Sequence, residues 1–283
     1  MILKLNKMAA VCLPILLLAA LYYPVFRWLV ISWNDSPYYA HAFMVPVIAG
    51  VIAWTKRHQL LYTSTSRSAG TAILAMGSVL YIMGFVYASY LVSAISLLVV
   101  LCGLVLYFTG RDGLRILAFP LGFLIFMVPM HPYLDNLSHH LQSLAASSSA
   151  AIITLLGVPV VRTGTELHLN GSTFVIGMPC SGINTLVALL TLAALYLYAI
   201  GGCFKTKIML FILVFPIAVI ANSARIASLL LIAHQWGPQT AMRFHDPFDV
   251  IFFVAALMCL LIVSKMVGCN IDIKGKTLPV AYA

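Results

Sequence analysis

Apolar stretches of eighteen or more residues recur along nearly the whole chain, and this feature most restricts how the chain can fold. Hydrophobic residues make up 63% of the 283 residues, and charged residues only 8%. A backbone surrounded by lipid must satisfy its hydrogen bonds internally, and a helix does so within one segment. Runs of this length are also long enough for a helix to cross about 30 Å of hydrocarbon. The sequence therefore predicts an all-α, polytopic transmembrane bundle, folded as a single integral domain over residues 1–283.

The apolar runs predict eight spans if each crossing needs about 20 residues. The spans lie near residues 8–33, 38–55, 70–88, 91–109, 114–130, 181–200, 208–232 and 247–267. With both termini inside, the cytoplasmic segments hold about twelve of the 16 basic residues, as the positive-inside rule requires. The first run is too long for the apolar core of a signal peptide and has no clear cleavage site, so we expect it to remain as the first span.

The net charge of +9 does not predict nucleic-acid binding, because the basic residues lie in short loops between spans and form no patch with interleaved aromatic residues. The sequence also has no P-loop, no glycine-rich dinucleotide turn, and neither the HExxH nor the paired CxxC spacing of metal ligands. We therefore expect no cofactor, no metal and no nucleic-acid partner, and we expect membrane lipids around the chain.

One long segment, residues 131–179, is predicted to lie outside the membrane on the non-cytoplasmic face. Its first half, from Tyr133 to Leu156, has the pattern of an amphipathic helix that lies on or dips into the membrane surface. Its second half alternates apolar and polar residues around Gly164 and the Asn170-Gly171 turn, which predicts a short hairpin.

Three chemically active residues fall at one depth in this topology, near the outer face. Cys180 begins the sixth span, and His245 directly precedes the eighth. Arg225 lies about 17 residues, or roughly 26 Å, into the seventh span, close to its outer end. A nucleophile, a cation and an imidazole are therefore predicted to share one layer.

Cys180 differs in its setting from the other cysteines, which we interpret as small buried apolar residues. At the start of a helix, free N–H groups and a partial positive charge favour the thiolate over the thiol. Ser181 and Gly182 leave space beside Cys180 for a peptide. No second cysteine is predicted on the outer face, so a disulfide is not expected. The other five cysteines are Cys12, Cys102, Cys203, Cys259 and Cys269.

Arg225 and His245 each have a structural interpretation beside the functional one. Arg225 could snorkel to the lipid headgroups or pair with backbone carbonyls, or it could be a fixed cation that points into a site, with Asn222 one turn earlier on the same face. His245 could be a surface or hydrogen-bonding residue. Four other histidines compete for a catalytic role, namely His131, His139, His140 and His234.

Taken together, a cysteine, a histidine and an arginine indicate acyl transfer. A thiolate attacks a peptide carbonyl, the histidine carries the proton to the leaving amine, and a cation stabilises the oxyanion. A peptide bond that reaches this layer would belong to a polypeptide that is itself anchored in the membrane, next to its own span.

The chain resembles the exosortase and archaeosortase family, integral-membrane transpeptidases that process proteins with a C-terminal sorting signal of the PEP-CTERM type. The resemblance extends over most of the sequence, from the run Tyr38-Tyr39-Ala40-His41 onward. Its specific part is three ordered blocks, Pro179-Cys180-Ser181-Gly182-Ile183-Asn184, Asn222-Ser223-Ala224-Arg225-Ile226 and Phe244-His245-Asp246.

The resemblance implies roles for individual residues. Cys180 would be the nucleophile, Arg225 would position the substrate or stabilise the oxyanion, and His245 would be the general acid and base. The archaeal branch carries an arginine at the third position, so His245 favours the bacterial exosortase type, and Arg243 could share the role of His245. Supporting residues would be Asn222, Ser181, Gly182, Asn184, His41 and Asp246.

The resemblance also implies a substrate and a location. The substrates would be exported proteins with a C-terminal anchor, cleaved through a thioester and transferred to a lipid or glycan acceptor or to water. The enzyme would lie in the cell inner membrane, with its site facing the periplasm.

Two other functions remain open at this stage. In a transporter, Arg225 would bind an anionic substrate. In a serine intramembrane protease, Ser181 or Ser223 would be the nucleophile.

Overall fold

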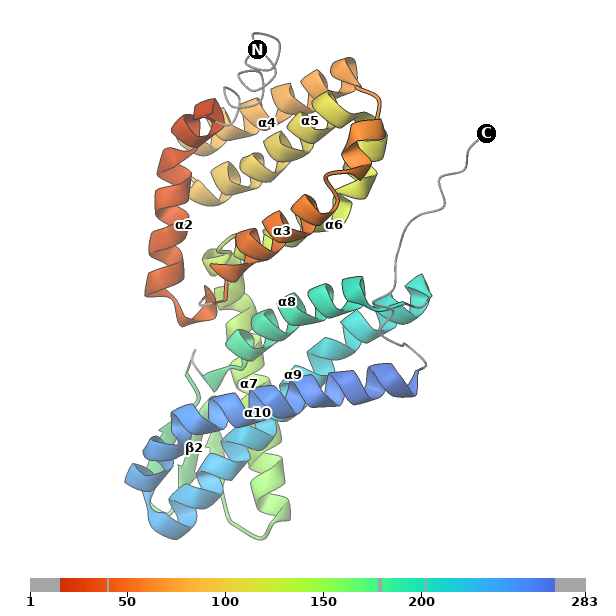
Figure 1. Ribbon diagram of the computed structural model, residues 1–283. Helices are drawn as coiled ribbons and strands as arrows, with labels where there is room; N and C mark the ends of the chain where they lie inside the picture. The colour runs from red at the N-terminus through yellow and green to blue at the C-terminus, as the bar shows by residue number, and fades with distance from the viewer. Residues whose placement is uncertain (1–15, 40, 178–179, 202, 268–283) are drawn as a thin grey trace. The chain divides into compact units, whose positions relative to one another are not determined.

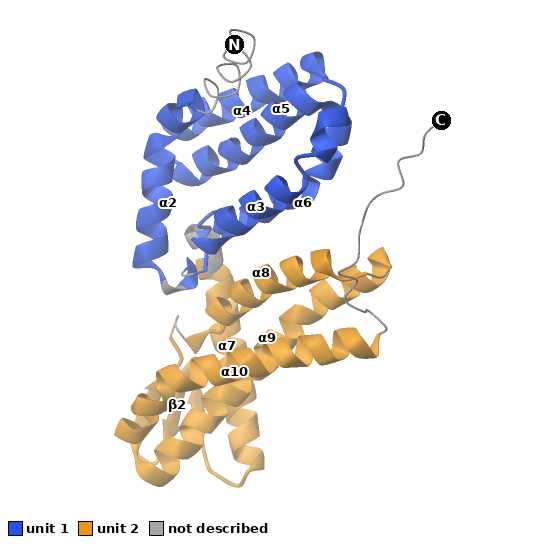
Figure 2. Cartoon of the chain, in the orientation of Figure 1, with its two compact units in different colours: residues 1–130 blue, residues 131–283 orange. Residues whose placement is uncertain are grey.

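The computed structural model describes residues 16–39, 41–177, 180–201 and 203–267 (Figure 1). They form two compact units, one within residues 1–130 and the other within residues 131–283 (Figure 2). The described elements of the first unit are α2 (Tyr23–Asp35), η1 (Pro37–Tyr39), α3 (Met44–Thr55), η2 (Gln59–Tyr62), α4 (Arg67–Val86), α5 (Tyr90–Ile116), α6 (Ala118–Phe123) and η3 (Leu124–Met127). Those of the second are α7 (His131–Leu155), β1 (Val161–Thr163), β2 (Glu166–Leu169), β3 (Ser172–Val175), α8 (Ile183–Ala199), α9 (Phe204–Trp236) and α10 (Pro238–Met266).

In the first unit, α4 and α5 pack closely because three buried glycines of α4, spaced seven residues apart, face α5. Gly70 faces Tyr107, Gly77 faces Val100 and Gly84 faces Ser93, so the two helices run antiparallel. A Cβ atom added to Gly77 would lie 2.6 Å from Val100 Cγ2. Small residues at a helix interface let backbones approach closely, which is a common way for membrane helices to associate.

Helix α5 extends further than the predicted span 91–109. It continues to Ile116 across a kink at Gly110, whose φ is 64°, and its last turn carries an exposed Asp112–Arg115 ion pair of 3.2 Å. The first residues of the predicted fifth span, 114–130, therefore belong to α5. The rest of that span forms only α6 and the short 3₁₀ helix that follows it.

Among the described residues, four helices are long and apolar enough to cross a membrane, namely α4, α5, α9 and α10. Helix α3, residues 118–127 and helix α8 are apolar but shorter. The 12 residues of α3 span about 18 Å, less than a hydrocarbon core of about 30 Å. The prediction of a helical, multi-pass membrane protein is confirmed, whereas the eight spans and their orientation stay predictions.

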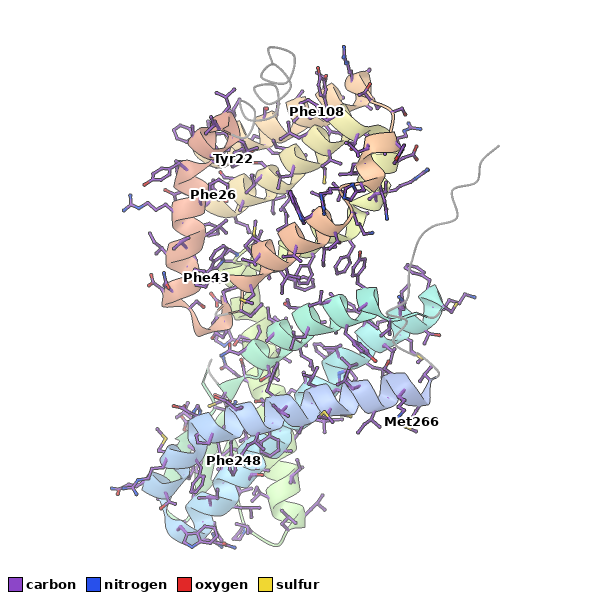
Figure 3. The ribbon with its side chains drawn as sticks, viewed as in Figure 1. Tyr22, Phe26, Phe43, Phe108, Phe248 and Met266 are labelled. Carbon is purple, nitrogen blue, oxygen red and sulfur yellow. The ribbon has the colours of Figure 1, made fainter. Side chains whose placement is uncertain are left out.

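The surfaces of these helices carry large apolar side chains, as expected where lipid is the solvent. Phe108 on α5 and Met266 at the end of α10 project away from the helices that bear them (Figure 3). Met266 is 80% exposed. In water such a surface would promote aggregation, so its extent agrees with a membrane location.

The second unit contains the helix and the strands predicted for residues 131–179. The amphipathic helix is α7, and its polar residues Ser138, Gln142 and Ser149 are buried. The predicted hairpin is the first part of a three-stranded antiparallel sheet in the order β1-β2-β3. Its turns lie at the two predicted positions and use left-handed residues, with φ of 64° at Gly164 and 75° at Gly171.

A buried cluster joins this sheet to α7 and α9. It includes Ala146 and Ile153 of α7, Leu167 of β2 and Ile226 of α9, and Cys180 packs against it. A hydrogen bond of 2.7 Å between the hydroxyls of Ser148 and Ser223 also connects α7 with α9. This packing fixes the segment that carries Cys180 against α9.

Helices α9 and α10 are joined by a single residue, Gly237, with a φ of 84°. A left-handed glycine ends a helix, and a proline fits the first position of the next one. Helix α10 therefore begins at Pro238, earlier than the predicted 247. His245 therefore lies inside α10, in the part of the helix that precedes the predicted span.

Candidate active site

Cys180 lies in the short segment between β3 and α8. Its N–H donates to the carbonyl oxygen of Gly177 at 3.0 Å, and its side chain is half-buried. Helix α8 begins at Ile183, with Gly182 as its N-cap. The expectation that Cys180 begins the helix is therefore corrected, because the left-handed Gly182, with a φ of 78°, separates it from the first turn.

Gly182 and Asn222 together hold this segment in place. The side-chain amide of Asn222, on α9, donates to the carbonyl oxygen of Cys180 at 2.9 Å. A Cβ atom at Gly182 would lie only 2.7 Å from Asn222 Cγ. Both the backbone conformation and the close approach of Asn222 therefore require glycine at this position.

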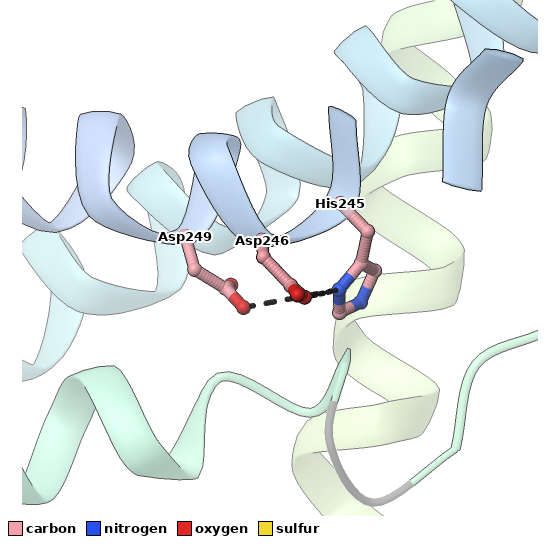
Figure 4. A group of neighbouring side chains, drawn as sticks. All are labelled: His245, Asp246 and Asp249. Carbon is pink, nitrogen blue, oxygen red and sulfur yellow. Dashed lines mark hydrogen bonds and ion pairs between the residues drawn. The ribbon is translucent and has the colours of Figure 1, made fainter. Parts of the chain in front are cut away.

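His245 faces Cys180 from α10. Its Nε2 atom lies 3.6 Å from Cys180 Sγ, within hydrogen-bonding distance for sulfur. Its other ring nitrogen, Nδ1, lies 3.0 Å from Asp246 Oδ1 and 4.0 Å from Asp249 Oδ2 (Figure 4). One ring nitrogen is thus directed to the thiol and the other to two carboxylates.

Arg225 is almost completely buried, with 4% of its side chain exposed. Its Nη1 atom pairs with Asp249 Oδ1 on α10, and the guanidinium interacts electrostatically with Cys180. Within the described part of the chain, its Nε and Nη2 atoms have no hydrogen-bond partner. Among the described residues, the charge of Arg225 is compensated by a side-chain carboxylate and not by backbone carbonyls.

Asp249 is the site residue that the sequence analysis missed. It joins the other residues because it lies four positions after His245 on the same helix and therefore on the same face. Its contact with Arg225 depends on how α9 and α10 pack, which the sequence pattern does not specify. The i,i+4 spacing of His245 and Asp249 was the available signal.

Ser181 and Asn184 flank the nucleophile. Ser181 is buried, and its hydroxyl accepts a hydrogen bond from the N–H of Ile183 at 3.4 Å. Asn184 lies in the first turn of α8, and its side-chain oxygen is buried without a partner among the described residues. A buried acceptor of this kind is available to a ligand.

The remaining predicted residues lie at the edge of this group or outside it. Asp246 contacts His245, but its side chain is 96% exposed. Arg243 is exposed on α10. His41 belongs to the first unit, in the turn before α3, where its ring stacks on Tyr39 at 6.4 Å. The structure brings together Cys180, Asn222, Arg225 and His245 within the second unit.

The group formed by His245, Asp246 and Asp249 also has the donor types that bind metals, and its donor atoms lie within 4.8 Å of one another. However, the guanidinium of Arg225 already occupies one oxygen of Asp249. A second cation at this position would be repelled by that guanidinium. The arrangement therefore fits proton transfer better than metal binding.

The geometry provides each part that acyl transfer needs. A thiol lies beside an imidazole nitrogen, and the opposite ring nitrogen faces carboxylates. A buried guanidinium interacts with the thiol, and two of its nitrogens have no partner among the described residues. This is the general arrangement of an activated nucleophile with an oriented base.

Comparison with known proteins identifies the family of the chain. The family model described as transmembrane exosortase (Exosortase_EpsH) matches residues 33–262, which include every residue of the group described above. No curated protein and no solved structure matches the chain. The match extends over most of the chain, and the chain belongs to the transmembrane exosortase family.

Proposed function

We propose that this exosortase is a membrane-embedded cysteine protease and transpeptidase. It cleaves the C-terminal sorting signal of exported, membrane-anchored proteins through a thioester and transfers the new C-terminus to an acceptor. The observation that carries the proposal is the 3.6 Å separation between Cys180 Sγ and His245 Nε2, beside the buried Arg225.

The first step forms the acyl-enzyme. His245 Nε2 accepts the proton of the Cys180 thiol, and the thiolate attacks the carbonyl carbon of the scissile bond. The carbonyl oxygen becomes an oxyanion, which the free Nε and Nη2 groups of Arg225 are available to stabilise. The C–N bond then breaks, His245 returns its proton to the leaving amine, and the substrate remains as a thioester on Cys180.

The second step releases the acyl group. An acceptor nucleophile attacks the thioester and gives its proton to His245, and the thiol of Cys180 is regenerated. A lipid or glycan acceptor gives transpeptidation, whereas water gives hydrolysis. Both outcomes use the same three residues.

The position of the site on membrane helices supports the proposed substrate and location. Arg225 and His245 lie on α9 and α10, both long enough to cross the bilayer. A peptide bond that reaches them would therefore lie next to the substrate's own span. We place the enzyme in the cell inner membrane with this site on the periplasmic side, as the distribution of basic residues favours.

Two alternative functions have less support. A transporter would use the buried Arg225, but it gives no role to the close approach of Cys180 Sγ and His245 Nε2, at 3.6 Å. A serine protease needs an accessible hydroxyl, whereas Ser223 is 3% exposed and bonded to Ser148 and to the carbonyl oxygen of Val219. Ser181 is likewise 3% exposed.

Cys180→Ala tests the proposal when the surface and membrane proteins of matched strains are compared by mass spectrometry of their C-terminal peptides. We expect proteins with a C-terminal span to keep that span only in the Cys180→Ala strain, because the nucleophile is lost. Cys203→Ala is the control, since Cys203 is an exposed cysteine outside the site. Identical C-termini in all strains, with normal amounts of each variant in the membrane, would rule out the transpeptidase and favour transport.

A further inference from the structure

We propose that Asp249 is the residue that positions both Arg225 and His245 for the reaction, and this inference rests on the function proposed above. Its carboxylate holds the guanidinium with one oxygen and faces the imidazole with the other. A single side chain thus determines the orientation of the proton carrier and of the oxyanion donor.

The contact with Arg225 fixes the carboxylate. Arg225 is 4% exposed and its Nη1 atom pairs with Asp249 Oδ1, so the ion pair is shielded from water on the arginine side. Asp249 occupies Nη1, and among the described residues the Nε and Nη2 groups have no hydrogen-bond partner. Asp249 therefore also determines which N–H groups of the guanidinium are left for the substrate.

The contact with His245 is looser. Asp249 Oδ2 lies 4.0 Å from His245 Nδ1, longer than a hydrogen bond. Catalytic hydrogen bonds are often long before substrate binds and shorten in the complex. Both residues lie on α10 at i and i+4, so a small side-chain rotation brings the two atoms into contact.

Asp246 is the competing carboxylate, and it lies closer to the same nitrogen, at 3.0 Å. Its side chain is 96% exposed, however, compared with 42% for Asp249. Water competes for an exposed carboxylate, and such a pair contributes little to the orientation of its partner. Asp249 is also anchored by Arg225 on a second helix.

The consequence of this arrangement is a defined tautomer of His245. A carboxylate facing Nδ1 favours the proton on Nδ1 and leaves Nε2 as an acceptor toward Cys180 Sγ. Charged and titratable side chains from three elements act on His245. Cys180 contacts it from the β3–α8 segment, and Asp246 and Asp249 face it from α10 itself. Arg225, on α9, acts on it indirectly because it pairs with Asp249. In the other tautomer the proton is on Nε2, and this nitrogen cannot accept the proton of the thiol.

Asp249→Asn tests the proposal, with Asp246→Asn as the matched control. Asn keeps an oxygen that accepts from Arg225 and turns its NH₂ group toward Nδ1, but it removes the charge that compensates the guanidinium. The amount of folded protein in the membrane is therefore compared between the two variants. Nitrogen-15 solid-state NMR of the full chain in lipid bilayers, with labelled histidine, reports the tautomer. His245→Gln identifies the signal of His245 among the eight histidines. We expect the Nδ1–H tautomer in the natural protein and in Asp246→Asn, and the Nε2–H tautomer in Asp249→Asn.

Turnover gives the second readout. We expect kcat of Asp249→Asn to fall by roughly 10²-fold or more, by analogy with the asparagine substitution in a serine-protease triad. KM should stay within about twofold of its natural value, since the positioning acts on proton transfer. We expect kcat of Asp246→Asn to fall by less than that of Asp249→Asn.

Three outcomes overturn the inference. They are an unchanged tautomer in Asp249→Asn, a tautomer change in Asp246→Asn alone, and full turnover in spite of a changed tautomer. The NMR result does not depend on turnover. If the natural protein processed no substrate, the proposed function would fail while the test of the tautomer remained valid.

Discussion

Gly182 is the residue on which the position of Cys180 most depends. Its left-handed φ of 78° turns the chain just before α8, and the absence of a side chain lets Asn222 reach the carbonyl oxygen of Cys180. The nucleophile is thus positioned by backbone geometry and one amide, three residues before Ile183, where the helix begins.

Gly182→Ala should therefore lower the cleavage rate by much more than its loss of stability explains. The new Cβ atom would lie 2.7 Å from Asn222 Cγ and force Asn222 or Cys180 to move. A displacement of about 1 Å at a reacting group can reduce a rate by 10²-fold. The measurement is the cleavage rate of an anchored substrate in vesicles, together with the thermal unfolding midpoint.

Gly157→Ala is the control for this substitution. Gly157 has a similar φ of 81°, but an added Cβ atom would have nothing within 4 Å. Both variants bear the backbone strain of about 1–2 kcal/mol that a left-handed non-glycine residue causes. Equal activity in the two variants would contradict the role given to the Asn222 contact.

The sequence predicted much of the site at this scale, because Cys180, Arg225, His245 and Asn222 do come together within the second unit. It could not predict the partner of Arg225, since that partner depends on the rotation of α10 against α9. It also placed Cys180 at the start of the helix, because a Ser-Gly pair does not reveal that its glycine adopts a left-handed conformation.

Among the elements, the α4–α5 pair depends on the seam formed by Gly70, Gly77 and Gly84. The spacing of seven residues keeps these glycines on one face of α4. Membrane helices gain no hydrophobic free energy by leaving lipid, so close packing of this kind is a main source of their association.

Gly77→Ala is expected to lower the free energy of unfolding by about 1–3 kcal/mol, the usual cost of overpacking. Its Cβ atom would lie 2.6 Å from Val100 Cγ2 and 3.1 Å from the Val100 nitrogen, so both a side chain and a backbone must move. Gly50→Ala in α3 is the control, because nothing lies within 4 Å of its added Cβ atom. Thermal unfolding in detergent compares them. Equal midpoints would show that α4 and α5 are not held by the seam.

Helix boundaries show where sequence patterns lose their accuracy. The Gly237-Pro238 turn was recognised, yet the last span was expected to begin at 247 because the residues between are polar. The structure begins α10 at Pro238, since a proline at the first position starts a helix whatever the polarity of the next turns. Hydropathy therefore located the apolar part of α10, but it did not predict that the polar residues before 247 belong to the same helix.

At the scale of the whole molecule, the orientation of the second unit can be tested with one impermeant thiol reagent. The proposed topology places Thr163 of β1 outside and Cys203, just before α9, inside. Both positions are exposed. In intact cells, a chain whose single cysteine is Thr163→Cys should be labelled. A chain that retains only Cys203 should be labelled only after the membrane is permeabilised. Labelling of both single-cysteine chains in intact cells would contradict the proposed orientation.

Helix α9 has 33 residues and is therefore about 50 Å long, well beyond the roughly 30 Å of a hydrocarbon core. Arg225 lies eleven residues, or about 16 Å, before Trp236 at the end of this helix. The helix therefore sets a fixed distance from this end to the reacting groups. Under the proposed reaction, two substrates with identical residues around the scissile bond would still be distinguished if their anchors began a few residues apart. The selectivity for substrates would then depend partly on the distance between the scissile bond and the anchor, because this distance has to match the position of the reacting groups along α9.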